Sequence, residues 1–334
     1  MRILVVDKTF TDDLLIEREV AAPDGEIVHY PDHEAIPEAD WRSADGVITF
    51  RLPPYVDSKS AWLDKCRIIV RGGVGFDGLS LEALGARGIA VCNVPDYGTT
   101  EVADHAIGLL LALRRGIATY HDTLRAEPVG GWTHLGPPCL DRLRGRRFGI
   151  IGLGRIGMAT ARRAQAFDMD VSFYDPYLPD GADLATGYTR VGSVAELFAS
   201  CDAVSLHTPL NDTSRHIVDA AALAEAREGL VLINTARGPT VDIDALYDAL
   251  RDNRVAGAAI DVLPQEPPAP DHPLIKAYTE RADWLAGRLI LTPHAAFYSE
   301  PGIADLRRKA ISTVMARLRG EGLRNCVNAR YLTA

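Results

Sequence analysis

The chain of 334 residues has little cysteine, no excess of positive charge and no long hydrophobic run. Its five cysteines are scattered, odd in number and free of any C-x-x-C pair, so neither a disulfide framework nor a zinc site is expected. We therefore expect no bound metal and thiols that stay reduced. The net charge of −9 excludes the basic footprint that nucleic-acid binding requires.

Segments that enter membranes are also missing. The N-terminal stretch Met1 to Asp7 has the pattern of a short strand and lacks the long apolar region of a signal peptide. The longest apolar run, Ala106 to Leu113, is far shorter than the roughly 20 residues that span a bilayer. We predict a cytoplasmic protein that has no membrane partner.

What the chain does have is a regular alternation of short β-branched runs with amphipathic stretches. This alternation is typical of βαβ units and parallel sheets. Helices are predicted over Thr100 to Arg115 and from Pro301 to about Leu318, where apolar residues recur with helical spacing. Strands are predicted at 2–6, 46–49, 67–70, 148–151, 171–174, 203–206, 230–233, 257–261 and 289–291.

The length is sufficient for two domains. We predict an α/β protein with two Rossmann-like, doubly wound parallel-sheet domains and a cleft between them. The first domain is discontinuous, built from residues 1–100 plus 300–334, and binds the substrate. The second, residues 101–299, binds a dinucleotide, with ligands at the carboxyl ends of the strands.

The dinucleotide prediction rests on a glycine-rich turn after the strand at 148–151. Gly152 permits the tight turn, Gly154 lets the backbone approach a pyrophosphate, and Gly157 lets the following helix pack closely on the sheet. The free N–H groups at the start of that helix then face the pyrophosphate. The alternative is a glycine turn with a purely structural role.

Asp175 supports the dinucleotide interpretation and indicates which cofactor is bound. It ends the next strand, 18 residues after Gly157, close to the spacing of an acid that binds the ribose 2′-hydroxyl. Its charge would repel a 2′-phosphate, and no Arg or Lys follows as far as Asp180. The pattern therefore favours NAD over NADP.

Three polar residues follow later strands, where the carboxyl ends of a parallel sheet converge. Arg237 can orient a carboxylate and polarise a carbonyl, and His294 can exchange a proton. Glu266 can hold the imidazole in one tautomer and stabilise its cation. Each has an ordinary alternative, as a surface arginine, a solvated loop acid and a packed histidine, but together they are the parts that a hydride-transfer site needs.

With these residues and motifs, the chain resembles the D-isomer-specific 2-hydroxyacid dehydrogenases. Within that family it is most similar to the C-terminal binding protein branch. The resemblance runs from about residue 45 to the end of the chain. The motifs that carry it are 71–77 (RGGVGFD), 90–95 (AVCNVP), the glycine motif, 173–177 (FYDPY), 234–238 (NTARG), 292–296 (TPHAA) and the tail at 323–334.

The resemblance implies a role for each matching residue. Arg237 would bind the carboxylate and carbonyl of a 2-keto acid, and His294, paired with Glu266, would be its acid or base. Asp261 would contact the nicotinamide carboxamide. The residues expected to contact NAD are Gly152, Gly154, Arg155, Ile156, Gly157, Asp175, His207, Thr208, Pro209, Thr213, Thr235, Ala236, Arg237, Asp261 and His294.

The substrate side is expected to involve the other domain. Backbone groups of Gly73, Val74 and Gly75 would hold the substrate carboxylate, and Phe297 replaces a tryptophan that shapes the pocket in the C-terminal binding proteins. Arg51 stands where that branch has a histidine. With Arg71 it would form a cationic rim for a second anionic group; the alternative is a solvent-exposed loop arginine.

The resemblance leaves two classes of function. The first is an NAD-dependent reductase of a small 2-keto acid, with phosphoglycerate dehydrogenation as a variant. The second is an NAD(H)-sensing corepressor. The corepressors have a long disordered tail, and this chain ends at Ala334 without one. It also has no basic nuclear-import run, and both features favour the enzyme. The family also implies a homodimer, with the helix from Thr100 at its interface.

A proline at 239, where the family places a small residue, removes one N–H donor.

Overall fold

The computed structural model describes residues 1–334 apart from 8–9, 11, 31, 51–54, 135 and 333–334. The chain forms two compact units. The first, the N-terminal unit, comprises Met1–Gly98 and Tyr298–Ala334. The second, the central unit, comprises Thr99–Phe297.

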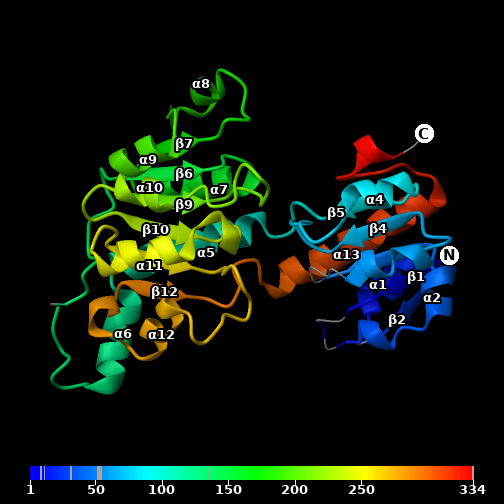
Figure 1. Cartoon of the computed structure of the whole chain (residues 1–334), viewed down its shortest axis with the longest axis horizontal. Coiled ribbons are helices and arrows are strands. Elements are labelled where there is room, and N and C mark those ends of the chain that lie inside the picture. Colours follow the sequence, from blue (N-terminus) through cyan, green and yellow to red (C-terminus); the bar gives the residue numbers. More distant parts are fainter. Residues whose placement is uncertain (8–9, 11, 31, 51–54, 135, 333–334) are drawn as a thin grey trace. The chain divides into compact units, whose positions relative to one another are not determined.

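The N-terminal unit is built on a five-stranded parallel sheet in the order β2-β1-β3-β4-β5 (Figure 1). Its strands are β1 (Arg2–Val5), β2 (Glu26–His29), β3 (Gly46–Thr49), β4 (Ile68–Arg71) and β5 (Ala90–Asn93). Its helices are α1 (Leu15–Ala21), η1 (His33–Ala35), α2 (Glu38–Ser43), α3 (Tyr55–Ser58), η2 (Ser60–Trp62), α4 (Leu81–Ala86), α13 (Glu300–Arg319) and η5 (Ala329–Tyr331).

The alternation of side chains along these strands builds two apolar layers. One layer contains Leu4 and packs with the buried Trp41 of α2 and Leu84 of α4. The opposite face is covered by α13, whose Val314 lies so close to Gly46 that an added methyl group there would come within 2.7 Å of it. Helix α13, from the C-terminal part of the chain, therefore completes the core of the first sheet.

The central unit has a seven-stranded parallel sheet in the order β12-β11-β10-β9-β6-β7-β8 (Figure 1). Its strands are β6 (Arg147–Ile151), β7 (Asp170–Tyr174), β8 (Thr189–Arg190), β9 (Ala203–Leu206), β10 (Val231–Asn234), β11 (Gly257–Ile260) and β12 (Leu289–Leu291). Its helices are α5 (Thr99–Arg114), α6 (Ile117–Ala126), α7 (Arg155–Ala166), α8 (Ala182–Thr186), α9 (Val194–Ser200), α10 (Ala220–Ala224), η3 (Gly238–Thr240), α11 (Ile243–Arg251), α12 (Pro273–Thr279) and η4 (Asp283–Leu285).

Both faces of this sheet are covered. Apolar residues of α5 and α7 form one core with Phe148 and Phe173, and those of α9, α10, α11 and α12 form the other with Leu206 and Leu232. The strand order reverses between β6 and β9, and such a switch point is where open α/β sheets bind ligands, at the carboxyl ends of the strands. The predicted α/β class, with two doubly wound parallel sheets, is confirmed.

The predicted helices correspond to α5 and α13, which begin one residue earlier than expected and end within one residue of the predicted boundaries. Three strands were not predicted, namely β2, β5 and β8. In β2 only Ile27 and Val28 are apolar, β5 is a short Ala-Val-Cys-Asn run, and β8 has two residues, so none produces a clear strand pattern. Their pairing with neighbouring strands makes them part of the sheets.

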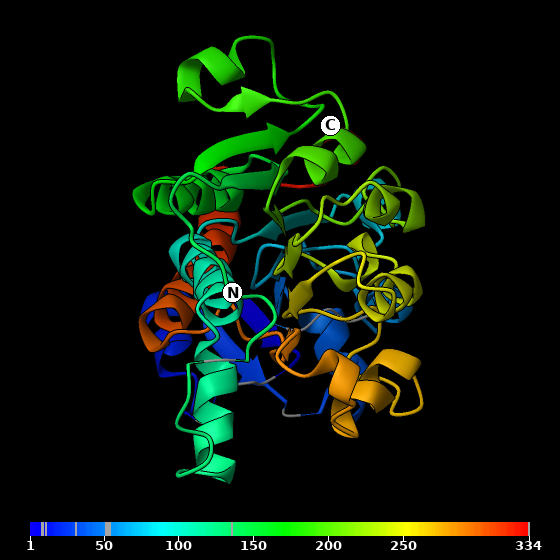
Figure 2. The same cartoon turned by 90° about the vertical axis from the view of Figure 1, so that its left-hand side faces the viewer.

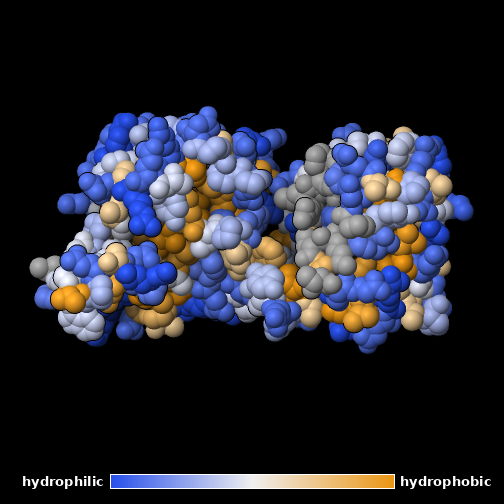
Figure 3. All heavy atoms as spheres, turned by 90° about the horizontal axis from the view of Figure 1, so that it is seen from below, coloured by the Kyte–Doolittle hydropathy of each residue, from blue (hydrophilic) through white to orange (hydrophobic). Residues whose placement is uncertain are grey.

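The surface drawn in Figure 3 is mostly hydrophilic, interrupted by hydrophobic patches. In the described ranges, no helix has both the length and the apolar character that crossing a membrane demands.

Candidate active site

The glycine-rich turn leads from β6 into α7 and forms an open cradle. Gly152 has a left-handed φ of 88°, and a side chain on Gly157 would come within 2.1 Å of the Gly152 carbonyl oxygen. Gly154, the N-cap of α7, has no atom of the described part of the chain within 4 Å of the position that a Cβ would occupy. The first and third glycines therefore allow close packing, while the middle one leaves room for a ligand over the helix N-terminus.

Asp175 follows β7 beside this turn. Its Oδ2 accepts a hydrogen bond of 3.0 Å from the Leu153 N–H, and its Oδ1 accepts one of 3.0 Å from the Tyr177 N–H. These two bonds fix the carboxylate next to the glycine cradle and leave it further acceptor capacity. That is the arrangement expected of an acid that binds the ribose of a dinucleotide.

Three buried polar atoms that have no hydrogen-bond partner among the described residues follow the neighbouring strands β9 and β10. They are Thr208 Oγ1 and His207 Nδ1 after β9, and Thr235 Oγ1 after β10. His207 Nε2 lies 2.9 Å from Ser205 Oγ, and burial lowers the pKa of His207 to about 3, so the ring is neutral at physiological pH. Buried polar groups normally have partners, so these atoms fit a site that a polar ligand completes.

The remaining predicted cofactor residues lie around this rim. Arg155 is exposed at the first position of α7, next to Ile156. The Pro209 carbonyl accepts from Ser214 Oγ at 2.6 Å. Thr213 Oγ1 lies 2.6 Å from the Tyr177 hydroxyl, which links the loop after β9 to the loop after β7.

Arg237 is presented by a tight turn at the end of β10. The buried Asn234 binds the turn from below, because its Oδ1 accepts from the Ala236 N–H at 3.0 Å and its Nδ2 donates to the Arg237 carbonyl at 3.0 Å. Thr240 Oγ1 donates to the same carbonyl at 2.6 Å. A side chain at Gly238 would collide with the Leu263 backbone at 2.0 Å, so the turn requires glycine there.

Pro239 fits this turn. It occupies an early position of η3, where a missing N–H costs no helical hydrogen bond, and its carbonyl accepts from the His216 N–H at 2.8 Å.

His294 and Glu266 form the clearest catalytic geometry. His294 Nδ1 lies 2.7 Å from Glu266 Oε2, and Glu266 Oε1 accepts from the Leu263 N–H at 2.9 Å. Partial burial works toward a higher pKa for Glu266, but the hydrogen bonds from His294 and Leu263 and the nearby charges of His294 and Arg237 lower it. An anionic Glu266 holds the proton on Nδ1, so Nε2 is the nitrogen left to exchange a proton.

Asp261 lies behind His294. Its side chain is almost fully buried and accepts hydrogen bonds from the N–H groups of Ala295 at 2.9 Å and Ala296 at 3.0 Å, and from Thr292 Oγ1 at 2.6 Å. Oδ2 keeps capacity for one further donor, such as the carboxamide predicted for it. Phe297 packs edge-on to His294, with ring centroids 6.1 Å apart.

In the N-terminal unit, the loop after β4 is held by the end of β5. The Val94 N–H donates to the Gly73 carbonyl at 3.0 Å, and Asn93 Nδ2 donates to the Val74 carbonyl at 2.7 Å. Arg71 Nη1 donates to the Gly72 carbonyl at 2.5 Å, and its guanidinium occupies the space that a side chain at Gly73 would need. Arg51 lies outside the described residues.

Sequence reasoning missed the residues that support the site from behind. Asn234 and Thr292 were part of family motifs but had no assigned role, and His105 lay in a predicted helix without a role. The available signal for Asn234 was a polar residue at the end of an otherwise apolar strand. His105 gave no such signal, because only the fold brings α5 beside the end of β12.

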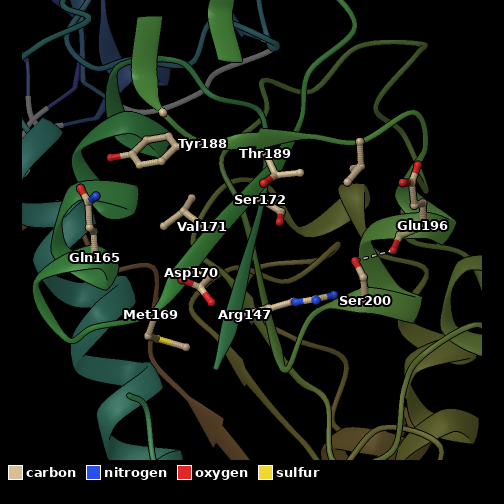
Figure 4. Close-up of a pocket in the computed structure, with 12 residues that line it drawn as sticks. Arg147, Gln165, Met169, Asp170, Val171, Ser172, Tyr188, Thr189, Glu196 and Ser200 are labelled. Atoms are coloured by element: carbon tan, nitrogen blue, oxygen red, sulfur yellow. Dashed lines mark hydrogen bonds between the residues drawn. The ribbon is translucent and has the colours of Figure 1, made fainter. Parts of the chain in front are cut away.

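A separate cavity of about 440 Å³ opens where β6 and β7 begin, and Figure 4 shows its lining side chains. Arg147 and Asp170, the first residues of these strands, line it. The residues described above follow the opposite, carboxyl ends of the strands, so this cavity is not part of the candidate active site.

Comparison with known proteins agrees with this geometry. Residues 107–296 match the model of the D-isomer specific 2-hydroxyacid dehydrogenase, NAD binding domain. The chain belongs to the D-isomer-specific 2-hydroxyacid dehydrogenase family. It therefore contains an NAD-binding domain, and the matched residues lie within the central unit.

Three similar proteins illustrate the range of the family. A D-3-phosphoglycerate dehydrogenase of Methanocaldococcus jannaschii is 35% identical over 79% of this chain and 48% of its own length. A solved NADPH-dependent glyoxylate/hydroxypyruvate reductase of Sinorhizobium meliloti, in complex with NADP and malonate, is 30% identical, with a TM-score of 0.82 over 98% of this chain and 96% of that one. A D-lactate dehydrogenase of Aquifex aeolicus, complexed with NAD and lactic acid, is 25% identical, with a TM-score of 0.80 over 96% of both chains. The chain spans about half the length of the curated relatives it matches.

Proposed function

We propose that this protein is an NAD-dependent dehydrogenase that interconverts a small 2-keto acid and the corresponding D-2-hydroxy acid. The observation that carries the proposal is the hydrogen bond between His294 and Glu266, close enough to Arg237 for its charge to act on Glu266. All three belong to the unit that contains the NAD-binding domain. Membership of the family supports the reaction class.

Arg237, His294 and Glu266 each have one role in the proposed reaction. Arg237 binds the substrate carboxylate and polarises the carbonyl through its paired donors. His294 Nε2 gives a proton to the carbonyl oxygen in reduction and removes it in oxidation, and Glu266 stabilises the imidazolium form. When bound, the nicotinamide ring supplies the hydride for reduction or accepts it in oxidation. Backbone groups of Gly73, Val74 and Gly75 remain our prediction for further contacts to the substrate carboxylate.

We propose NAD rather than NADP as the preferred cofactor. Asp175 places a carboxylate where the ribose is expected, and a 2′-phosphate there would face its negative charge. The reductase of Sinorhizobium meliloti shows that NADP binding also occurs among similar proteins, so the preference has to be measured for this chain.

Phosphoglycerate dehydrogenation is the second candidate, because the similar curated proteins of Methanocaldococcus jannaschii and Archaeoglobus fulgidus have that name. This function would require a cation for the substrate phosphate. Arg71, folded over Gly73, is one such cation, and Arg51 remains the predicted second.

The test is NADH oxidation, followed by the loss of NADH absorbance, with glyoxylate, hydroxypyruvate, phosphohydroxypyruvate, phenylpyruvate and 4-methylthio-2-oxobutyrate. We expect one of the first two to be reduced with the highest kcat/KM, because the similar reductase of Sinorhizobium meliloti is named for these two acids. Preference for phosphohydroxypyruvate would favour the second candidate. Absence of turnover with every acid, while NADH still binds, would contradict the enzyme and favour the corepressor type of function. A pull-down with a peptide bearing the corepressors' target motif then tests that alternative.

We further propose a homodimer. α5 packs its apolar face within its own unit, against α7, β10 and β11. The segment after it is different: α6 buries none of its residues and extends away from the sheet (Figure 2). Ile117, Val129 and Trp132 in and after α6 are 57%, 87% and 80% exposed. A second copy of the chain that covers these side chains would remove them from water.

A further inference from the structure

A hydrogen-bond chain connects helix α5 to the backbone beside His294. His105 Nε2 lies 3.1 Å from Thr292 Oγ1, and Thr292 Oγ1 donates to Asp261 Oδ1 at 2.6 Å. His105 comes from the middle of α5, Thr292 follows β12, and Asp261 follows β11. Three elements that are distant in the sequence therefore meet in one polar cluster.

The direction of each bond in this chain can be deduced. A threonine hydroxyl has a single proton, and here it is donated to the Asp261 carboxylate. The hydroxyl can therefore only accept from His105, so His105 Nε2 carries the hydrogen. Thr292 Oγ1 keeps both of its hydrogen bonds only while His105 supplies that donor.

The hydrogen-bond chain ends at Asp261, which contacts the backbone around His294. Its carboxylate accepts the consecutive N–H groups of Ala295 and Ala296, and its carbonyl oxygen accepts the His294 N–H at 2.8 Å. His294 itself has a left-handed φ of 53°, which is unfavourable for a residue with a side chain. The concave arrangement of N–H groups around one carboxylate holds that backbone in place.

We propose that His105 is a positioning residue for His294, acting through Thr292 and Asp261. The inference rests on the proposed dehydrogenase function, in which His294 exchanges the substrate proton. His105 Nε2 is 3.8 Å from Asp261 Oδ1, too far for a direct hydrogen bond, so Thr292 Oγ1 is the hydrogen-bonded link between them. Removal of His105 takes away one of the two hydrogen bonds of Thr292 Oγ1, which weakens its hold on Asp261 Oδ1 and on the turn that presents His294.

Two sets of variants separate this role from simple packing. His105→Leu and Thr292→Val remove the donor and the hydroxyl with little change of volume, and His105→Gln restores an N–H donor. Asp104→Asn is the matched control, because Asp104 is the preceding residue of α5 and pairs with Arg163 Nε at 2.6 Å instead. kcat, the KM of the keto acid, NADH affinity by fluorescence and melting temperature are measured for each.

We expect His105→Leu to lower kcat about three- to tenfold, the effect of one lost hydrogen bond, with the melting temperature unchanged and NADH affinity changed by less than kcat. His105→Gln should recover most of the rate, and Asp104→Asn should match the wild type. The double variant His105→Leu/Thr292→Val should be no slower than the slower single variant, since both break one chain. A wild-type kcat in His105→Leu, no recovery in His105→Gln, or losses that multiply in the double variant would each overturn the proposal.

A second readout does not depend on turnover. In the cofactor-free protein labelled with ¹⁵N-histidine, the ring signals of His294, assigned from a His294→Gln variant, report its surroundings. They should shift in His105→Leu and Thr292→Val and stay in place in His105→Gln and Asp104→Asn. Unshifted His294 signals in His105→Leu refute the positioning role. Absence of wild-type turnover with every keto acid, in contrast, refutes the proposed function alone.

Discussion

Glu266 and His294 are 28 residues apart in the chain, yet their side chains form a hydrogen bond of 2.7 Å. The bond commits Nδ1 of the histidine to the carboxylate and leaves Nε2 for chemistry. The second carboxylate oxygen accepts from the backbone of Leu263, so the acid that orients the histidine is itself oriented. The imidazole is thus held in one tautomer.

Replacement of His294 by alanine should lower kcat by about 10²–10⁴-fold, the usual contribution of general acid–base catalysis. NADH affinity should change little, because the glycine cradle and Asp175 are untouched. Steady-state kinetics with the preferred keto acid and fluorescence titration of NADH measure the two effects. A variant that retains the wild-type rate would remove His294 from the mechanism.

Replacement of Glu266 by glutamine should change how stability depends on pH. The folded protein lowers the pKa of Glu266 below its ordinary value of 4.5, so its ionised form stabilises the fold above that value. The contribution disappears as the pH falls through the lowered pKa. Melting temperatures of wild type and Glu266→Gln should therefore differ at neutral pH and converge in acid. A difference that is constant at every pH would show that the pKa is not lowered.

Replacement of Asp175 by alanine should relax the choice of cofactor. We expect the ratio of kcat/KM for NADPH to that for NADH to rise by about tenfold or more, equivalent to about 1.4 kcal/mol, because the charge that repels a 2′-phosphate is gone. Asp175→Asn keeps the size of the side chain and loses only the charge, so it isolates the electrostatic part. If neither variant improves the use of NADPH, Asp175 does not discriminate between the cofactors.

The glycines of the turn should respond differently to alanine. Gly157→Ala places a methyl group 2.1 Å from the Gly152 carbonyl oxygen, so unfolding free energy should fall by about 1–3 kcal/mol, as in an overpacked core. Gly154→Ala meets no atom within 4 Å and should fold normally while binding NADH more weakly. Urea denaturation and NADH titration compare the pair. Equal NADH affinity in Gly154→Ala and wild type would contradict a pyrophosphate at this position.

The proposed dimer should depend on the exposed side chains after α6. Trp132→Ser combined with Val129→Ser should weaken self-association by about tenfold or more, as expected when an aromatic anchor is removed. Light scattering after size-exclusion chromatography over a dilution series measures the change. Leu184→Ser, at an equally exposed apolar residue of α8, is the control and should leave the dimer intact. A monomeric wild type, or an unaffected double variant, would refute this interface.

The parts of the site that could be predicted are those with a local signal. The glycine motif and Asp175 are readable because turn geometry and spacing in one βαβ unit place them side by side. The short strand β8, in contrast, forms because its two residues pair with β7, and no local periodicity predicts it.

The candidate catalytic residues fall between these cases. Arg237, Glu266 and His294 were selected for their residue types after strand ends and for their family motifs. The bond between His294 and Glu266 and the left-handed backbone of His294 appear only in three dimensions. The same is true of His105, whose connection to Thr292 spans 187 residues. Long-range contacts of this kind depend on how helices pack on the sheet.

The packing of Val314 over Gly46 has a consequence for the synthesis of the protein. A ribosome makes the strands of the N-terminal unit first, but α13, which covers one face of their sheet, follows only after all of the central unit. During translation the central unit is therefore the first able to complete its core, and the earlier strands wait with apolar side chains uncovered. The segment that is synthesised first is therefore the last to complete its core.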